Sequence, residues 1–419
     1  MKRRIFLTLA MAAALLAGCV PDQSAMVQDD RIKITVLAGQ STSDAGIEDM
    51  INEWMEKEYP EVELEWECVD WGDRFESQMR GRLASGDIPD IMIGKAQDVK
   101  AYAKTGQLGT ISDECSAKIK ENALDSVTLD NKVYGLPYNF WYQGVIYNKD
   151  IFEQLGITPP KTTEEMNLAV ARLKEEGIVP FAVHFQESWK VANMTMQYMM
   201  NEIFKYDPQW GDGFRTGEVN FEGNEDVITC MTNNQKILDA SWEDALLLDQ
   251  FESDSRFTQG EAAMYLTGSW SMQFANQYGK TIRFGIFPYP NRNGDADLIR
   301  ETNLTFMKSA DTEYDALIDD IFYSLVSDEQ LTGEILEFTQ ADSAIKGMGA
   351  AYKSKIQDDI DVYENQGRVI DVSTGNAQLI WNFQNRVAQE QLAWLKKEKT
   401  LQEVLVFADD NRAASAYEE

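Results

Sequence analysis

Short apolar strands alternate with amphipathic helices along this chain, and that alternation is the strongest constraint on its fold. The apolar residues of 32–36 alternate as in a buried strand, and those of 47–55 have the spacing of one helix face. A second strand and helix are expected at 62–66 and 70–83, and a short apolar strand follows at 88–93. Repeated units of this kind predict a largely parallel sheet covered by helices, with ligands at the carboxyl ends of its strands.

A new series of units begins after Pro137. Alternating residues near its end run into Pro288 and Pro290, which cannot continue a central strand, so we expect a second crossing between domains there. The expected elements are strands at 144–148, 179–185, 262–266 and 282–286, and helices at 150–155, 162–177, 189–204, 224–239 and from Trp270.

The N-terminus has the pattern of a targeting segment. Basic residues at 2–4 precede an apolar run at 5–16, which is shorter than the about 20 residues that span a bilayer. The run ends in LAGC, which resembles a bacterial lipobox with Cys19 as the lipidated residue. We expect a signal peptide at 1–18, a polar tether at 19–29, and a protein anchored through Cys19 on the extracytoplasmic face of a bacterial membrane. An ordinary secretory peptide is the alternative.

Length and charge limit the remaining possibilities. The chain has 419 residues, more than one hydrophobic core usually organises, so two domains are expected. Its formal net charge of −32 disfavours nucleic acid and anionic lipid headgroups as ligands, although an acidic surface also serves solubility.

Cysteine and histidine are too sparse for a metal site. Beyond Cys19 only Cys68, Cys115 and Cys230 remain, which allows at most one disulfide, and His184 is the single histidine. These residues provide no His/Cys metal constellation, and we expect no cofactor.

Several blocks, taken in order, resemble the family 1 extracellular solute-binding proteins of ABC importers, a group that includes sugar-binding lipoproteins. No single block is specific, but their order and spacing are. They are ITVL within 32–37, GDIPDI at 86–91, YGLP at 134–137, VIYNKD at 145–150, FTQGEAAM at 257–264 and TGSW at 267–270.

The resemblance implies an α/β, two-lobed periplasmic-binding-protein-like fold of the class II type, each lobe a mostly parallel sheet flanked by helices. Lobe one would comprise 30–138 and 288–328, and lobe two 139–287 and 329–419. The protein would be a monomeric receptor and not an enzyme. It would capture a carbohydrate, such as an oligosaccharide, by lobe closure and deliver it to the permease subunits of an ABC importer.

Aromatic residues gather where the cleft of such a protein would lie. Sugars offer apolar C–H faces to aromatic rings and hydroxyls to polar side chains. The stretch 138–142 contains Asn139 and Trp141, although strand alternation would send part of it to the core. Trp270 follows Gly268 and Ser269 at a strand-to-helix turn, where the resemblance implies a stacking aromatic; packing in the core is the alternative.

Further candidates come from the same resemblance. Glu187 and Trp189 match a stretch in maltose-type receptors that binds hydroxyls and stacks on a ring, whereas His184 is expected to be an ordinary polar residue at a strand end. Trp381 lies where C-terminal helices would approach the sugar; packing with Leu379 and Val387 is the alternative. A Gly-Lys pair stands where maltose-type receptors have an aromatic, which makes maltose itself doubtful. The lobe-one candidates are Gln40, Ser41, Trp71, Lys95 and Asp98.

Other functions remain open at this point. A receptor for a peptide or polyamine would need converging carboxylates, whereas a sugar site would combine tryptophans with mixed polar groups. A lipid-anchored glycosidase would need two carboxylates at a defined separation, which 70 acidic residues could supply by coincidence. The sequence contains no nucleophile elbow, P-loop or dinucleotide fingerprint. A purely structural surface protein would have no use for a hinged cleft.

Overall fold

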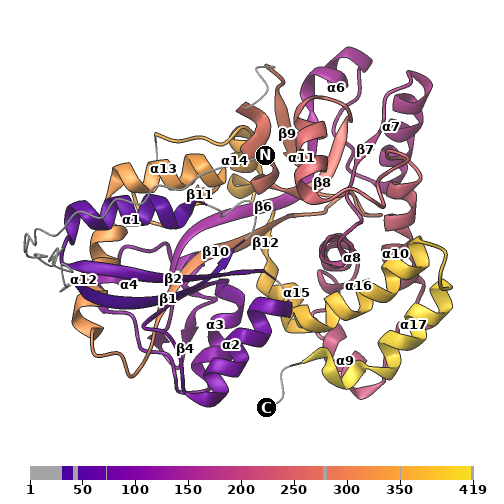
Figure 1. The fold of residues 1–419 in the computed structure, drawn as a ribbon. Helices are drawn as coiled ribbons and strands as arrows, with labels where there is room; N and C mark the ends of the chain where they lie inside the picture. Colours follow the sequence, from indigo (N-terminus) through magenta and orange to yellow (C-terminus); the bar gives the residue numbers. More distant parts are fainter. Residues whose placement is uncertain (1–30, 41–45, 72, 277–280, 350, 417–419) are drawn as a thin grey trace, which may run out of the picture.

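The chain folds into two α/β lobes that lie side by side (Figure 1). Two long strands, β6 (Leu136–Asn148) and β10 (Leu298–Lys308), run antiparallel to each other from one lobe into the other. They join the strands of both lobes into one 10-stranded sheet, which confirms the expected two-lobed fold. The computed structural model describes residues 31–40, 46–71, 73–276, 281–349 and 351–416.

The first lobe follows the strand–helix pattern of the sequence. β1 (Ile32–Gln40) runs parallel to β2 (Val62–Asp70) and β3 (Ile91–Gly94), whereas β10 returns antiparallel to β3. Its other elements are α1 (Ile47–Glu58), α2 (Asp73–Ser85), α3 (Ala96–Ala103), α4 (Asp113–Ser116), α5 (Glu121–Leu124), β4 (Thr128–Leu129), β5 (Lys132–Val133), α12 (Asp315–Leu325), α13 (Glu329–Thr339) and β11 (Asp342–Ser343).

The sheet of the second lobe is mixed. β6 is antiparallel to β8 (Met264–Gly268) and β9 (Phe284–Phe287), and β7 (Phe181–Ala182) is parallel to β8. The remaining elements are α6 (Lys149–Leu155), α7 (Thr163–Glu175), α8 (Ser188–Met199), a π-helical turn (Met200–Phe204), α9 (Trp210–Thr216), α10 (Glu225–Leu238), α11 (Gln250–Thr258), a 3₁₀ segment (Ser269–Asn276), α14 (Gln357–Asn365), β12 (Val369–Asp371), α15 (Val372–Gln378), α16 (Trp381–Leu395), α17 (Leu401–Asp410) and a 3₁₀ turn (Arg412–Ser415).

Local signals located the start of α7 correctly but were wrong for other elements. Thr162 and Glu165 form the expected capping box at the start of α7. The strand expected at 179–185 is reduced to two residues, and the helix expected from Trp270 is a 3₁₀ segment. The second crossing does not lie at the two prolines. The chain passes them after β9 and crosses on β10, which contains no proline and pairs with β6.

Residues 329–343 contact first-lobe elements, although the sequence assigns 329–419 to lobe two. The Tyr138 hydroxyl lies 2.9 Å from the Thr332 hydroxyl of α13, α13 packs against α1, and β11 pairs with β6 at Asn139 and Phe140.

The described residues contain no feature of a metal or membrane-spanning site. Cys68, Cys115 and Cys230 are free thiols. Among the described residues, no group of three or more His, Cys, Asp or Glu side chains could hold a metal ion. No helix in this part of the chain is both long enough and apolar enough to cross a bilayer. The expected signal peptide, Cys19, the tether and Ser41 lie outside the described residues.

We predict that Gly144→Ala lowers the free energy of unfolding by about 1–3 kcal/mol, because the sheet has no room for a side chain there. A Cβ at Gly144 of β6 would lie 2.7 Å from the Phe287 carbonyl oxygen and 2.9 Å from Leu298 Cδ2. Urea denaturation measures the change. The control is Gly81→Ala on the exposed side of α2, where no atom lies within 4 Å and the stability should rise by up to about 1 kcal/mol. Equal effects of both variants would contradict the prediction.

Candidate ligand-binding site

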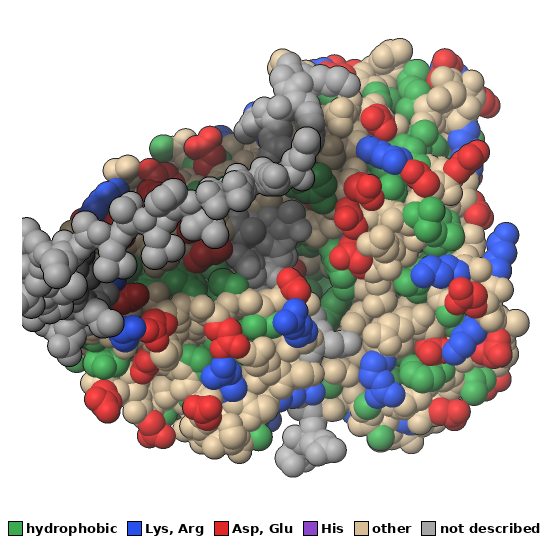
Figure 2. Space-filling model, in the orientation of Figure 1, with side chains coloured by type: hydrophobic (Ala, Val, Ile, Leu, Met, Phe, Trp, Pro, Cys, Tyr) green, Lys and Arg blue, Asp and Glu red, His purple; other side chains and the backbone are tan. Residues whose placement is uncertain are grey.

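A cavity of about 440 Å³ lies between the two lobes. The space-filling view shows the molecule hollowed there (Figure 2). Its lining combines tryptophans and other apolar residues with amides and carboxylates from both lobes and from the crossing strands. The residues are Trp71, Phe75, Trp141, Trp189, Met196, Met200, Phe251, Trp270, Ile299, Val372 and Trp381; Gln97, Gln143, Asn193, Gln197, Gln250, Asn376 and Gln384; and Asp70, Lys95, Asp98, Glu187, Asp249 and Glu301.

The structure brings most of the candidates expected from the sequence to this cavity. Trp71, Lys95, Asp98, Trp141, Glu187, Trp189, Trp270 and Trp381 all line it. Asn139 does not: it is buried in β6, where its Nδ2 lies 3.5 Å from the Thr339 hydroxyl. Gln40 ends β1, paired with Asp70 of β2.

Two of the tryptophans form a rigid corner of the cavity. The Trp141 and Trp270 rings meet edge to face, with centroids 5.3 Å apart and an interplanar angle of 64°. The indole nitrogen of Trp141 donates to the Thr339 carbonyl at 3.1 Å. Trp270 is only 6% exposed, and a Cβ at Gly268 would overlap its ring, so this glycine lets the ring fold back over the strand. Trp270 therefore packs in the core and lines the cavity at the same time.

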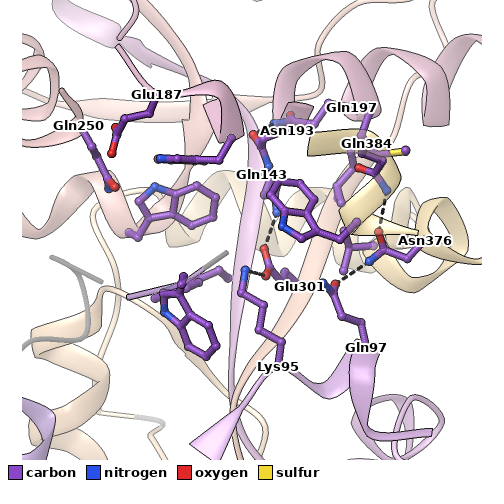
Figure 3. A pocket seen from close by; sticks show the side chains of 18 of the residues that line it. Lys95, Gln97, Gln143, Glu187, Asn193, Gln197, Gln250, Glu301, Asn376 and Gln384 are labelled. Carbon is purple, nitrogen blue, oxygen red and sulfur yellow. Dashed lines mark hydrogen bonds and ion pairs between the residues drawn. The ribbon is translucent and has the colours of Figure 1, made fainter. Parts of the chain in front are cut away.

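A chain of polar contacts crosses the floor of the cavity (Figure 3). The Lys95 ammonium donates to one carboxylate oxygen of Glu301 at 2.6 Å, and the Gln143 amide donates to the other at 2.6 Å. Asn193 donates to Gln143 at 2.8 Å, and Gln197 donates to Asn193 at 2.9 Å. The chain thus runs from the start of α3 through β10 and β6 to α8, and it satisfies a carboxylate that is only 5% exposed.

A second set of amides links α3 directly with the C-terminal helices. Asn376 of α15 donates to Gln97 of α3 at 2.7 Å, and Gln384 of α16 donates to Asn376 at 2.8 Å (Figure 3). Gln97 and Gln384 thereby reach across the edge of the cavity from different lobes.

Glu187 and Trp189 begin α8, and buried His184 lies beside them. His184 Nδ1 is 3.2 Å from a Glu187 carboxylate oxygen, and the His184 ring centroid is 5.1 Å from that of Trp189. Burial lowers the pKa of His184 to about 4, so the imidazole is neutral at neutral pH. Partial burial alone would raise the pKa of Glu187, but polar contacts with His184, Trp189 and Gln250 outweigh it and lower that pKa. Glu187 is therefore an ionised hydrogen-bond acceptor.

A buried lysine and a buried aspartate lie near the start of α8 and do not line the cavity. The Lys190 ammonium donates to the Leu266 carbonyl at 2.6 Å and sits 4.7 Å from the Tyr265 ring centroid. Asp254 accepts a hydrogen bond from Gln250 at 3.2 Å. Burial lowers the pKa of Lys190 and raises that of Asp254. The two side chains support the segments that carry Trp189, Gln250 and Trp270.

Sequence reasoning missed the amides and Glu301. Gln143 lies in the mostly apolar stretch 140–147, and a lone amide there is a signal that could have identified it. Glu301 lies in the polar run 300–303, which gives no such signal. The amides of α8, α15 and α16 lie on helices whose positions relative to the cavity depend on the tertiary fold.

The sequence pattern of the family described as bacterial extracellular solute-binding protein matches residues 38–330. The chain is 24% identical to a multiple sugar-binding protein of Streptococcus mutans, over 73% of this chain and 74% of that protein. It is 23% identical to the melibiose/raffinose/stachyose-binding protein MelE of Bacillus subtilis, over 69% and 68% of the two chains.

Solved structures share the fold. The solute-binding protein RafE in complex with raffinose superimposes with a TM-score of 0.76 at 17% identity, over 92% of this chain and all (100%) of that one. The matched family and these relatives are binding proteins and not enzymes, as the sequence led us to expect. Since the family pattern spans most of the chain, the protein belongs to the bacterial extracellular solute-binding proteins.

Proposed function

We propose that the protein is a carbohydrate receptor of an ABC importer. The observation that carries the proposal is the cavity between the lobes, where tryptophans from both lobes stand among amides and carboxylates. Such a lining suits a sugar, whose C–H faces stack on aromatic rings while its hydroxyls exchange hydrogen bonds with polar groups. The relatives named for binding multiple sugars and for binding melibiose, raffinose and stachyose support this choice.

Capture would proceed by closure of the lobes. The binding groups are divided between them, with Trp71 and Lys95 on one side and Glu187, Trp189 and Trp270 on the other. A sugar that contacts both sides binds the closed form more tightly than the open form and so favours closure. The closed form would then deliver its sugar to the permease subunits.

The lobes would divide along the crossing strands. We propose 30–138 and the residues from β10 to 346 as lobe one, and 139–297 and 347–419 as lobe two. Residues 288–297 precede the crossing, and the Tyr289 ring packs there on Tyr198 of α8. Residues 329–346 would join lobe one because α13 packs against α1 and Ile345 forms a bridge with Ile119. The receptor would act as a monomer on the extracytoplasmic face of a bacterial membrane, held by a lipid on Cys19 after removal of residues 1–18.

Trp270→Ala should weaken raffinose binding about two- to tenfold, a modest loss because only 6% of this residue is exposed for a sugar to cover. Because the ring also packs on Trp141, the melting temperature should fall as well. Calorimetric titration below the melting range separates the two effects. Trp394→Ala, in a half-buried tryptophan of α16 outside the cavity, is the control and should leave affinity unchanged. A Trp270 variant with a lower melting temperature and intact affinity would assign the ring to the core alone.

Raffinose at saturation should reduce the radius of gyration measured by small-angle scattering, since closure brings the lobes together. A scattering profile that does not change at saturation would indicate a preformed pocket.

Asn376→Ala removes the hydrogen bond to Gln97 and should raise the dissociation constant for raffinose severalfold, in line with about 0.5–1.5 kcal/mol for one hydrogen bond.

Cys19→Ala should abolish incorporation of a labelled fatty acid in bacterial cells, because no other cysteine ends the targeting run. The matched control is Cys68→Ala, in a cysteine of β2, which should keep the label. Label that persists on the Cys19 variant would refute the anchor.

A further inference from the structure

We infer that the cavity accepts uncharged saccharides and rejects acidic ones, such as those bearing uronate groups, and that the Lys95–Glu301 pair sets this preference. The inference rests on the proposed carbohydrate function and adds a selection by ligand charge.

The charges around the cavity are strongly unbalanced. Among the described residues that line it, carboxylates far outnumber cations, and Lys95 is the one cation. An acidic saccharide would bring a further negative charge into this setting, and like charges at close range in a partly dehydrated site repel strongly. The carboxylates are Asp70, Asp98, Glu187, Asp249 and Glu301.

Lys95 is already committed to a buried partner. Its ammonium lies 2.6 Å from Glu301 and 5.5 Å from the centroid of the Trp71 ring. The Glu301 side chain is only 6% exposed, and its second oxygen accepts from Gln143. Lys95 could share its three donors with a ligand carboxylate, but Glu301 already balances its positive charge, so the pair as a whole offers an anion no net opposite charge.

Neither His184 nor Lys190 can replace it. His184 touches Glu187, but it is fully buried and stays neutral at neutral pH. Lys190 is buried and does not line the cavity, and its ammonium donates to the Leu266 carbonyl. Glu187 therefore presents its negative charge to the cavity. A hydroxyl can donate to this carboxylate, whereas a ligand carboxylate has no proton to donate.

The charge of the whole molecule acts in the same direction. The formal net charge is −32, and red carboxylates are spread over both halves of the face seen in Figure 2. This field lowers the local concentration of anionic ligands, and it weakens as salt is added. Rejection of acidic saccharides should therefore be strongest at low ionic strength.

The test uses ligands that differ in charge. Raffinose and stachyose are compared with derivatives in which one primary alcohol is oxidised to a carboxylate, and with the methyl esters of those derivatives. By calorimetric titration, each acid should bind at least about tenfold more weakly than its neutral parent. The ester should recover much of this loss, because it restores neutrality without restoring the hydroxyl. The difference should shrink between about 0.01 M and about 1 M salt.

A charge variant identifies the residues responsible. Glu301→Gln keeps the shape and a partner for Gln143 but removes the negative charge beside the Lys95 ammonium. The ratio of the dissociation constants of the acid and its neutral parent should therefore fall at least about threefold. Glu65→Gln is the matched control: it releases Lys33 on the surface of β1 and β2 and should leave the preference unchanged.

The outcomes separate the two proposals. An acid that binds as tightly as its parent and its ester would overturn the charge selection while leaving the carbohydrate function intact. An unchanged preference in Glu301→Gln, in a variant that still binds the neutral parent, would overturn the role of the pair. If no neutral or acidic saccharide binds the wild-type protein, the carbohydrate function itself fails, and the charge selection fails with it.

Discussion

The pairing of β6 with β10 is the interaction on which the rest of the structure depends. The two strands pair from Leu136 and Phe306 in one lobe to Gln143 and Ile299 near the other. Every strand of the large sheet attaches directly or indirectly to this pair. Because both strands are buried along most of their length, the pair forms a continuous core between the lobes, and its middle is also the floor of the cavity.

Placing polar groups in that floor requires that each finds a partner. Glu301 and Gln143 would be costly in buried strands if left unpaired, and the contacts through Lys95, Asn193 and Gln197 satisfy them. The partners come from α3 in one lobe and α8 in the other. The same contacts therefore stabilise the crossing strands and position the polar lining of the cavity. The site thus helps to hold together the two strands that connect the lobes.

The local part of this arrangement was predictable from the sequence, and the long-range part was not. Alternating residues at 32–36 and the Thr162–Glu165 capping box specify their elements through near neighbours, and both were predicted correctly. β10 was missed because its identity depends on pairing with β6, more than a hundred residues earlier in the chain. Trp141, Trp189 and Trp270 were proposed through family resemblance and lie at the cavity. Glu301 was missed because it lies in the polar run 300–303, where nothing marks it as a buried residue.

Burial of the corner formed by Trp141 and Trp270 links ligand binding to folding stability. The Trp141 and Trp270 rings are almost fully buried, held by each other and by the Thr339 carbonyl. Rings that are fixed in this way lose little further freedom when a ligand stacks on them, which favours affinity. As a consequence, a substitution of Trp141 or Trp270 changes the core as well as the site. Specificity can vary more freely at exposed charged side chains of the lining, such as Asp70, which alter the field in the cavity without altering the tryptophans or the buried contacts of the floor.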